Sequence, residues 1–221
     1  MKKNQFLTII LMFIVSVSFA QVELVKDPVA KKILDAFSKK AAQSKGVRIK
    51  FSYTTDNRQN DYHDTQKGYI FLEGQKFKVI IPKTEIISDG KTVWTYMKED
   101  NEVTLSETDT SEVSIFNPAK LFTAYKHGFK YLLIGEETIE NAKYNVIDLY
   151  PEDTENNPYS IIRLKINKST DEIYSVKTSG KSGIDYTFQV AEYKPNIAIP
   201  EELFKFDQSK YPDDIEITDM R

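Results

Sequence analysis

The chain has 221 residues, with 30 basic and 33 acidic side chains, a formal net charge of −3 and no cysteine. Without cysteine there are no disulfides, no thiol chemistry and no lipid on an N-terminal cysteine, so the protein is not itself a lipoprotein. A mildly acidic chain with no basic block argues against nucleic acid or an anionic membrane surface as its main partner.

The first twenty residues have the pattern of a secretory signal peptide. A charged start, Met1-Lys2-Lys3, precedes an apolar run from Phe6 to Val15 and the small residues of Ser18-Phe19-Ala20. This order predicts cleavage after Ala20. The run is too short for a membrane-spanning helix, which needs about 20 residues, so an uncleaved anchor is the disfavoured alternative. We therefore expect export to the periplasm and a single soluble domain over residues 21–221.

The first element of that domain is predicted to be an amphipathic helix over residues 28–45. Asp27 can cap its start, Pro28 suits its first turn, and Gly46 closes it. One face of this helix collects the apolar side chains Val29, Ile33, Leu34 and Phe37. We interpret the segment as a lid with one apolar side.

From residue 47 the apolar period changes from 3.6 to 2, which is typical of half-buried strands. The first strand is expected over 47–53, and the polar residues 54–67 are expected to form a loop or the end of a long hairpin. Further strands, separated by turn signals such as Asp89-Gly90, are expected at 68–73, 77–81, 85–88, 92–97, 102–105, 144–150, 159–167, 173–178 and 184–193. The residues after Phe204-Lys205-Phe206 are expected to form a polar tail.

A second helix is predicted over residues 117–127. Asn117 and Pro118 suit its N-cap and first turn, and Leu121, Phe122 and Tyr125 share one face. Many short strands with only two helices predict a mainly β (α+β) domain built on one large antiparallel sheet. Because right-handed twist accumulates from strand to strand, such a sheet curls, and the two helices are available to cover its concave face.

The sequence offers little for catalysis. His63 lies in the polar stretch and His127 follows a predicted helix end, and for both we favour an exposed, structural histidine over a ligand or base. No nucleophile-elbow, zinc-protease or phosphate-loop motif is present. The acidic run at 152–157 lacks the spacing of a calcium loop. We expect no enzyme activity, no cofactor and no metal, although a carboxylate pair for sugar hydrolysis stays open.

Several segments resemble those of the LolA-type lipoprotein carriers. Ser88–Tyr96 is similar to the family's Asp-Gly-Lys-x-Leu-Trp-x-Tyr segment, and Gly68–Leu72 with Phe77-Lys78-Val79 looks like the hairpin before it. Asn117–Phe122, Leu149-Tyr150-Pro151 and the closing Phe204-x-Phe206 follow in the family's order. The resemblance therefore spans nearly all of the chain after the predicted cleavage site.

The resemblance implies an incomplete antiparallel β-barrel, covered by an N-terminal helix and a mid-chain helix, around a hydrophobic cavity. It also implies that the protein accepts acylated lipoproteins, or another lipid, from an inner-membrane lipoprotein-release transporter and delivers them to an outer-membrane acceptor. No nucleic acid is expected as a partner, and the expected form is a monomer. The alternative is a binding module of the same fold that senses lipid or envelope stress and acts through a protein partner.

One turn departs from the family pattern. The family commonly has Arg-Pro before the Phe of this hairpin, and that arginine helps to latch the lid. Here the turn is Glu73-Gly74-Gln75-Lys76, one residue shorter and without arginine. Lys76 or Lys78 could replace the arginine only as a point charge, without its planar fork. The chain therefore does not supply the family's latch in its usual form.

Aromatic side chains are frequent, with 13 Phe, 13 Tyr and one Trp. Most are expected to pack in a core, but a curled sheet with an apolar inner face can also enclose a cavity. From the alternation along the strands and the second helix, the lipid-cavity candidates are Tyr69, Phe71, Phe77, Val79, Trp94, Tyr96, Leu121, Phe122, Tyr125, Ile162, Leu164, Val176, Tyr186 and Phe188. A one-residue error in register would move a whole strand's set to the opposite face.

Overall fold

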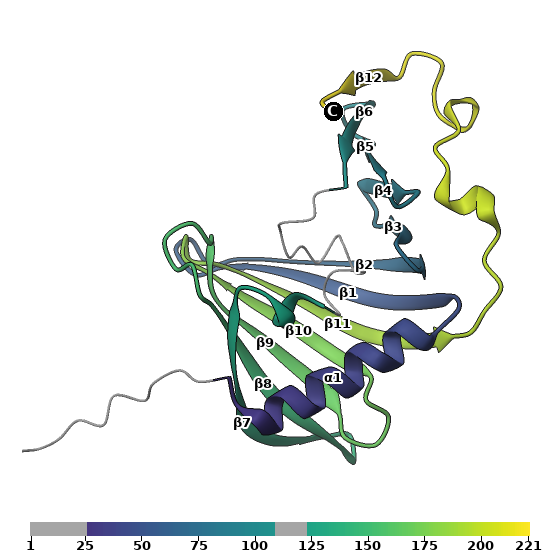
Figure 1. The fold of residues 1–221 in the computed structure, drawn as a ribbon. Helices are drawn as coiled ribbons and strands as arrows, with labels where there is room; N and C mark the ends of the chain where they lie inside the picture. The colour runs from purple at the N-terminus through teal and green to yellow at the C-terminus, as the bar shows by residue number, and fades with distance from the viewer. Residues whose placement is uncertain (1–25, 109–122) are drawn as a thin grey trace, which may run out of the picture.

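The computed structural model describes residues 26–108 and 123–221, and a curled β-sheet forms most of this part of the chain (Figure 1). Its strands are β1 (Val47–Asn57), β2 (Tyr62–Glu73), β3 (Lys76–Ile80), β4 (Thr84–Ser88), β5 (Thr92–Met97), β6 (Glu102–Glu107), β7 (Phe129–Ile139), β8 (Ala142–Pro151), β9 (Tyr159–Asn167), β10 (Ile173–Gly180), β11 (Ile184–Pro195) and β12 (Glu216–Asp219). Within the described residues they form one sheet in the order β12-β6-β5-β4-β3-β2-β1-β11-β10-β9-β8-β7. Only β12 runs parallel to its neighbour, β6. The mainly β fold with an incomplete barrel is confirmed.

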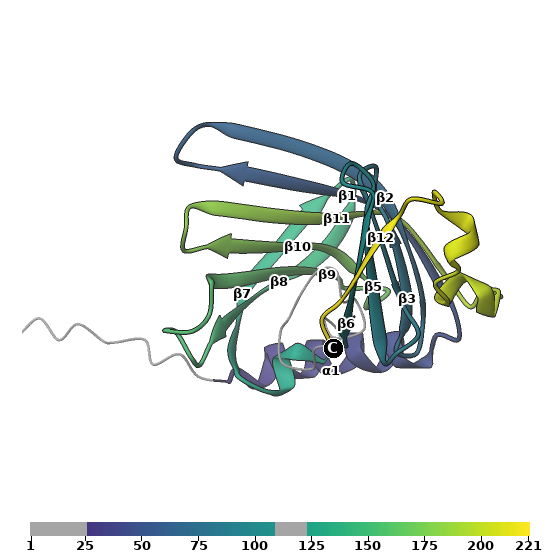
Figure 2. The same cartoon turned by 90° about the horizontal axis from the view of Figure 1, so that it is seen from above.

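The predicted N-terminal helix is confirmed as α1 (Pro28–Gln43), which ends two residues earlier than expected, at a cap formed by Ser44. Its apolar side chains Leu34 and Phe37 are buried against the sheet, whereas Val29, expected on the same face, is 54% exposed. Figure 2 shows α1 lying across the hollow side of the curled sheet. The helix therefore covers the concave face, as its amphipathic pattern indicated.

The polar stretch 54–67 is the end of a long hairpin and not a loop. Strands β1 and β2 stay paired out to Asn57 and Tyr62, and the hydroxyl groups of Thr54 and Thr65 lie 2.9 Å apart across the pair. Asp61, with a φ of 56°, lies in the tight turn. Threonine favours strands, and polar pairs such as Thr–Thr also stabilise neighbouring strands, so the low aliphatic content did not end these strands.

Two strands were not predicted. The alternation of β7 is broken by a bulge between Leu133 and Gly135, which leaves Ile134 46% exposed, so its period is neither 2 nor 3.6. Strand β12 has few apolar side chains and forms only by pairing with β6. The start of the predicted second helix lies outside the described residues, and its end is a short 3₁₀ helix, η1 (Ala124–Lys126).

The C-terminal segment is not a free polar tail but packs along the outer face of β3–β5 (Figures 1 and 2). It contains two 3₁₀ helices, η2 (Glu201–Phe204) and η3 (Gln208–Lys210). Phe206 stacks on Trp94 at 6.3 Å between ring centroids, and Tyr211 meets Tyr96 edge-on at 4.8 Å. Phe204 is fully buried. These aromatic contacts attach the segment to the sheet.

None of the helices in residues 26–108 and 123–221 is long and apolar enough to cross a membrane. The predicted signal peptide, residues 1–20, lies outside the described residues.

Replacing Phe204 by alanine should destabilise the whole domain. The ring has no exposed surface, and the Lys76 ammonium lies 5.5 Å from its centroid. We expect a loss of about 3–5 kcal/mol in the free energy of unfolding, measured by urea denaturation. Alanine at the exposed neighbour Glu202 is the control and should change stability by less than about 0.5 kcal/mol. Equal, small effects at both positions would show that the C-terminal segment is not part of the cooperative fold.

Candidate functional site

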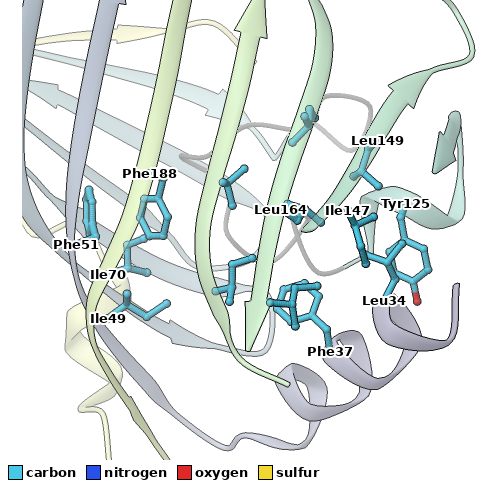
Figure 3. Packing of buried hydrophobic residues seen from close by; sticks show 14 of the residues in the cluster. Leu34, Phe37, Ile49, Phe51, Ile70, Tyr125, Ile147, Leu149, Leu164 and Phe188 are labelled. Atoms are coloured by element: carbon cyan, nitrogen blue, oxygen red, sulfur yellow. The ribbon is translucent and has the colours of Figure 1, made fainter. Parts of the chain in front are cut away.

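The inner face of the sheet is apolar over most of its strands. Cross-strand register places Ile147 opposite Leu164, Leu164 opposite Val176, and Val176 opposite Phe188. In the other half of the sheet, Ile49 pairs with Ile70, Ile70 with Val79, and Val79 with Ile86. All eight side chains are buried in one cluster. The face that α1 covers is therefore one continuous apolar surface (Figure 3).

Aromatic rings line the middle of this inner face. The rings of Phe51 and Phe188, on adjacent strands, lie 4.8 Å apart, and Figure 3 shows them side by side. Further along the same two strands, Tyr53 stacks on Tyr186 at 5.8 Å. Burial raises the pKa of the Tyr53 phenol far above its usual range, so this ring stays neutral. Neutral aromatic rings give the face an adaptable apolar lining.

Asp27 joins α1 to the edge strand β7. One carboxylate oxygen accepts hydrogen bonds from the amides of Val29 at 2.8 Å and Ala30 at 3.3 Å, and the other accepts from Leu133 N at 3.1 Å. The Asp27 amide in turn donates to the carbonyl of Tyr131 at 3.1 Å. These bonds, first of all the one from Leu133, lower the pKa of the Asp27 carboxyl. A single residue therefore caps the helix and pairs with the open edge of the sheet.

Two further polar contacts hold the helix along its length. The Tyr125 hydroxyl donates to Asp35 Oδ1 at 2.6 Å, and Lys31 pairs with the other oxygen of the same carboxylate at 2.7 Å. Nearer the C-terminal end, Lys40 pairs with Glu172 at 3.0 Å. Apolar burial by the helix is limited to a few side chains, chiefly Leu34 and Phe37. Polar contacts thus supply an appreciable part of the attachment of α1.

In the described part of the chain, neither lysine at the position of the family's arginine forms an ion pair with α1. Lys76 pairs with Glu201 in η2 at 2.6 Å, and Lys78 pairs with Glu85 on the neighbouring strand at 2.6 Å. Both side chains belong to the outer face, because Phe77 between them points inward. Lys76 therefore attaches the C-terminal segment, and the helix is held by the polar contacts of Asp27, Asp35 and Lys40 together with its buried apolar side chains.

The structure divides the predicted cavity residues between the two faces of the sheet. Those on the inner apolar face are Phe77, Val79, Ile162, Leu164, Val176, Tyr186 and Phe188, and Tyr125 is buried against α1. Leu121 and Phe122 lie outside the described residues. The inner-face set remains the candidate lining for a ligand.

The assignment of Tyr69, Phe71, Trp94 and Tyr96 to the same face is wrong. The turn at Gly74 pairs Glu73 with Lys76, so Leu72 pairs with Phe77 and Ile70 with Val79. Tyr69 and Phe71 alternate with these residues and therefore face outward. Trp94 and Tyr96 also point outward, where they contact the rings of the C-terminal segment. The error is a one-residue choice of face in β2 and β5.

Several inner-face residues were not among the candidates. The clearest are Phe51, Ile70, Tyr131, Ile147 and Leu149, all buried in the central cluster. Strand β8 is buried on both faces from Tyr144 to Leu149, so its sequence does not alternate and gives no choice of face. In β1 and β2, the alternation of apolar and polar side chains was the sequence signal that could have identified these residues.

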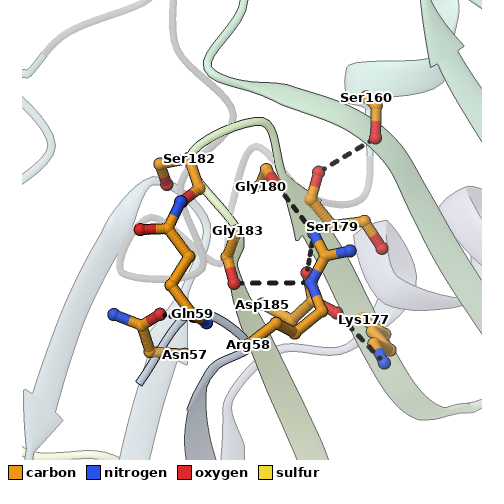
Figure 4. A network of polar contacts seen from close by, with 10 residues as sticks. All are labelled: Asn57, Arg58, Gln59, Ser160, Lys177, Ser179, Gly180, Ser182, Gly183 and Asp185. Carbon is orange, nitrogen blue, oxygen red and sulfur yellow. Dashed lines mark hydrogen bonds and ion pairs between the residues drawn. The ribbon is translucent and has the colours of Figure 1, made fainter. Parts of the chain in front are cut away.

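A polar network fixes the tips of two hairpins at one end of the sheet (Figure 4). Arg58, in the β1–β2 turn, donates to the carbonyl of Gly180 at 3.1 Å and lies 3.3 Å from Asp185. The Gln59 side chain donates to the carbonyl of Ser182 at 3.0 Å. The two hairpins thus hold each other, which keeps neighbouring strands of the inner face in position.

Both histidines are exposed in the structure. His63 is exposed and its Nδ1 lies 2.5 Å from Asp56, while His127 is exposed beyond η1. Among the described residues there is no group of three or more histidine, aspartate or glutamate side chains that could hold a metal ion. The arrangement of the inner face suits it to receive an apolar group.

A comparison of the chain with models of known protein families shows which family it belongs to. Residues 42–207 match the model of the outer membrane lipoprotein carrier protein LolA. The chain belongs to the LolA family. The matched region runs from the end of α1 to the start of η3 and so includes the inner apolar face.

Individual relatives of this LolA-family chain are distant. An uncharacterized protein of Methanocaldococcus jannaschii is 25% identical over 206 residues, which cover 91% of this chain and 58% of that protein. An uncharacterized conserved protein from Thermus thermophilus shares 16% identity with a TM-score of 0.57 over 86% of this chain and 99% of its own. A LolA superfamily protein from Nitrosomonas europaea has 15% identity and a TM-score of 0.44, over 80% and 97% of the two chains. The Thermus structure supports the fold.

Replacing Asp27 by alanine should weaken the attachment of α1. The change removes acceptors for three backbone amides, one of them on β7. We expect a loss of about 1–2 kcal/mol in the free energy of unfolding at pH 7, measured by urea denaturation. Alanine at the exposed helix residue Lys32 is the control and should leave stability nearly unchanged.

The same contact should depend on pH. The pKa of Asp27 is lower in the folded protein, so its contribution is complete above the unfolded value of about 3.9 and is lost as the pH falls through the folded value. Asp27→Asn keeps one acceptor oxygen but does not titrate. The stability difference between the native protein and this variant should therefore stay constant above about pH 4 and shrink as the pH falls further, through the folded pKa of Asp27. A difference that stays constant below about pH 4 as well would contradict the role assigned to the charge.

Proposed function

We propose that this protein carries the acyl chains of a lipoprotein, or of another lipid, against the inner apolar face of its sheet. The observation that carries this proposal is the combination of one continuous apolar surface, lined by Phe51 and Phe188, with the helix α1 that covers it. An acyl chain is flexible and apolar, and it needs area and not a set of fixed polar partners. Membership of a family of lipoprotein carriers supports the same choice.

The helix α1 is the element that a ligand would displace. Its buried apolar side chains, chiefly Leu34 and Phe37, contribute roughly 1.5–3 kcal/mol each by leaving water. An acyl chain of about fifteen methylenes would gain ~12 kcal/mol on burial, at about 0.8 kcal/mol per methylene. Burial of the acyl chain therefore contributes more free energy than the displaced side chains of the helix lose, so the ligand can replace the helix against the sheet. The polar contacts of Asp27 and Asp35 would then set how readily the helix opens.

The proposed carrier works without catalysis, in the periplasm, after removal of residues 1–20. It would receive its load from an inner-membrane lipoprotein-release transporter and give it up to an outer-membrane acceptor. Because residues 76 and 78 are paired with the C-terminal segment and with β4, the opening step would depend on the contacts of α1 with β7 and Tyr125. The handover would thus use a different latch from the arginine common in the family.

The inner face can be tested with a matched pair of tyrosine variants. Tyr186 lies on the inner face beside Tyr53, and Tyr69 lies on the outer face of β2. We expect Tyr186→Ser to weaken the binding of a fluorescent fatty acid about tenfold, which corresponds to ~1.4 kcal/mol of lost contact, and Tyr69→Ser to leave it unchanged. Titration of the native protein and both variants measures this, with circular dichroism to check that each is folded.

A photoactivatable fatty acid locates the site independently. Cross-linked peptides should come from β1, β9 and β11, around Phe51, Leu164 and Phe188. Cross-links confined to the outer face around Trp94, or no saturable binding, would contradict the proposal. Saturable binding of a free lipid that no acceptor protein removes would instead favour a lipid-sensing module of the same fold.

A further inference from the structure

Basic side chains gather on the outer face of the sheet although they are dispersed in the sequence. Cross-strand register places Arg163 opposite Lys177, and Arg48 opposite Lys194. Lys50 and Lys67 lie on the same outer face of β1 and β2, opposite Tyr69 and Ser52. The resulting surface, here called the basic outer face, crosses five neighbouring strands and is defined by Arg48, Lys50, Lys67, Arg163, Lys177 and Lys194.

Two of the carboxylates that balance this face, Asp148 and Asp185, are buried beneath its cations. Asp148 is 2% exposed, whereas its bidentate partner Arg163, at 2.7 Å, is 44% exposed. Asp185 is 9% exposed and lies 3.4 Å from Lys177, which is 48% exposed. Two cations directly opposite each other would repel without such carboxylates. The surface that solvent meets is consequently more positive than the residue count indicates.

The part of the basic outer face formed by β1, β2 and the end of β11 has fewer acidic partners still. Glu192 serves two cations, Arg48 at 3.0 Å and Lys194 at 2.8 Å. Within the described residues, Lys50 and Lys67 have no carboxylate at ion-pair distance, and both are exposed. Tyr69, which is 41% exposed, lies between them in the register. Two unpaired lysines around an exposed tyrosine resemble the composition of a membrane-interface surface, where tyrosine rings and basic groups meet lipid headgroups.

We propose that the basic outer face docks on a bilayer surface that contains anionic phospholipid headgroups. Lysine and arginine near such a surface each strengthen binding roughly fivefold, and the effect is screened within a Debye length. Within the described residues α1 lies on the opposite side of the sheet and the C-terminal segment covers β3–β5, so strands β9, β10, β11, β1 and β2 can approach a flat surface (Figures 1 and 2). The choice of a bilayer over an acidic protein rests on the proposed function, because a carrier of acyl chains has to reach a lipid surface.

The proposed docking surface differs from the expectation drawn from charge alone. The net charge of −3 and the absence of a basic run argued against an anionic membrane. In a strand, however, alternate residues share one face, so single lysines spaced along several strands form a patch that no run of sequence reveals. If the basic outer face docks on the bilayer, α1 and the inner face point away from the bilayer or lie sideways to its surface.

Vesicle flotation tests the proposal. The full protein is mixed with vesicles of phosphatidylcholine, or of phosphatidylcholine with about a third phosphatidylglycerol, at low salt and then at about 0.5 M salt. We expect at least thirtyfold stronger association with the anionic vesicles at low salt, lost at high salt. Lys50→Gln with Lys67→Gln should weaken it roughly twenty-five-fold, since two side chains of about fivefold each are removed. The matched control, Lys32→Gln with Lys91→Gln, removes the same charge from exposed positions elsewhere and should retain association.

Fatty-acid binding in the absence of vesicles separates this proposal from the carrier proposal. Retained binding by both double variants shows that the inner face is intact, so that any loss of association belongs to the outer face. Equal losses in both double variants, or no preference of the native protein for anionic vesicles, would overturn the docking surface. Binding of an acidic polypeptide without any vesicle association would also overturn it, in favour of a protein partner.

Discussion

The carboxylate of Asp27 accepts hydrogen bonds from the first turn of α1 and from the backbone of β7, and the rest of the arrangement depends on this contact. An open sheet leaves unpaired amides at its edge, and a helix leaves unpaired amides at its start. One residue satisfies both needs and so fixes where the helix lies over the concave face. The helix is held both by polar bonds at defined points and by a small apolar interface around Leu34 and Phe37.

The two faces of the sheet have different physical roles. The inner face is a continuous apolar surface under α1, while the outer face pairs exposed cations with buried carboxylates such as Asp148 and Asp185. The C-terminal segment occupies the outer face of β3–β5 through Phe204, Phe206 and Tyr211. In each half of the sheet the inner face packs apolar side chains, and the outer face carries either the charged side chains or the C-terminal segment. The family match over residues 42–207 includes both sides of the strands, whereas the distribution of charge is a property of the outer side.

Much of the fold follows from local sequence signals. The helix with its Asp27 cap, strand β5 and strand β9 follow from periodicity and turn residues, because these signals depend only on near neighbours. The two missed strands lack such a local signal: a bulge at Ile134 interrupts the alternation of β7, and β12 forms beside β6, which lies far away in the sequence. The same limit explains the mixed outcome for the candidate lining. Alternation identifies two sets of residues, and only the pairing of Leu72 with Phe77 decides which set faces the helix.

The most direct test is native mass spectrometry of the protein, purified gently from its native cells, with lipid extraction of what co-purifies. The account predicts a bound lipoprotein or lipid whose acyl chains protect the inner face, and an increase in hydrogen exchange along α1 in the loaded form. A protein that is empty, binds no acyl probe and keeps α1 protected would contradict it.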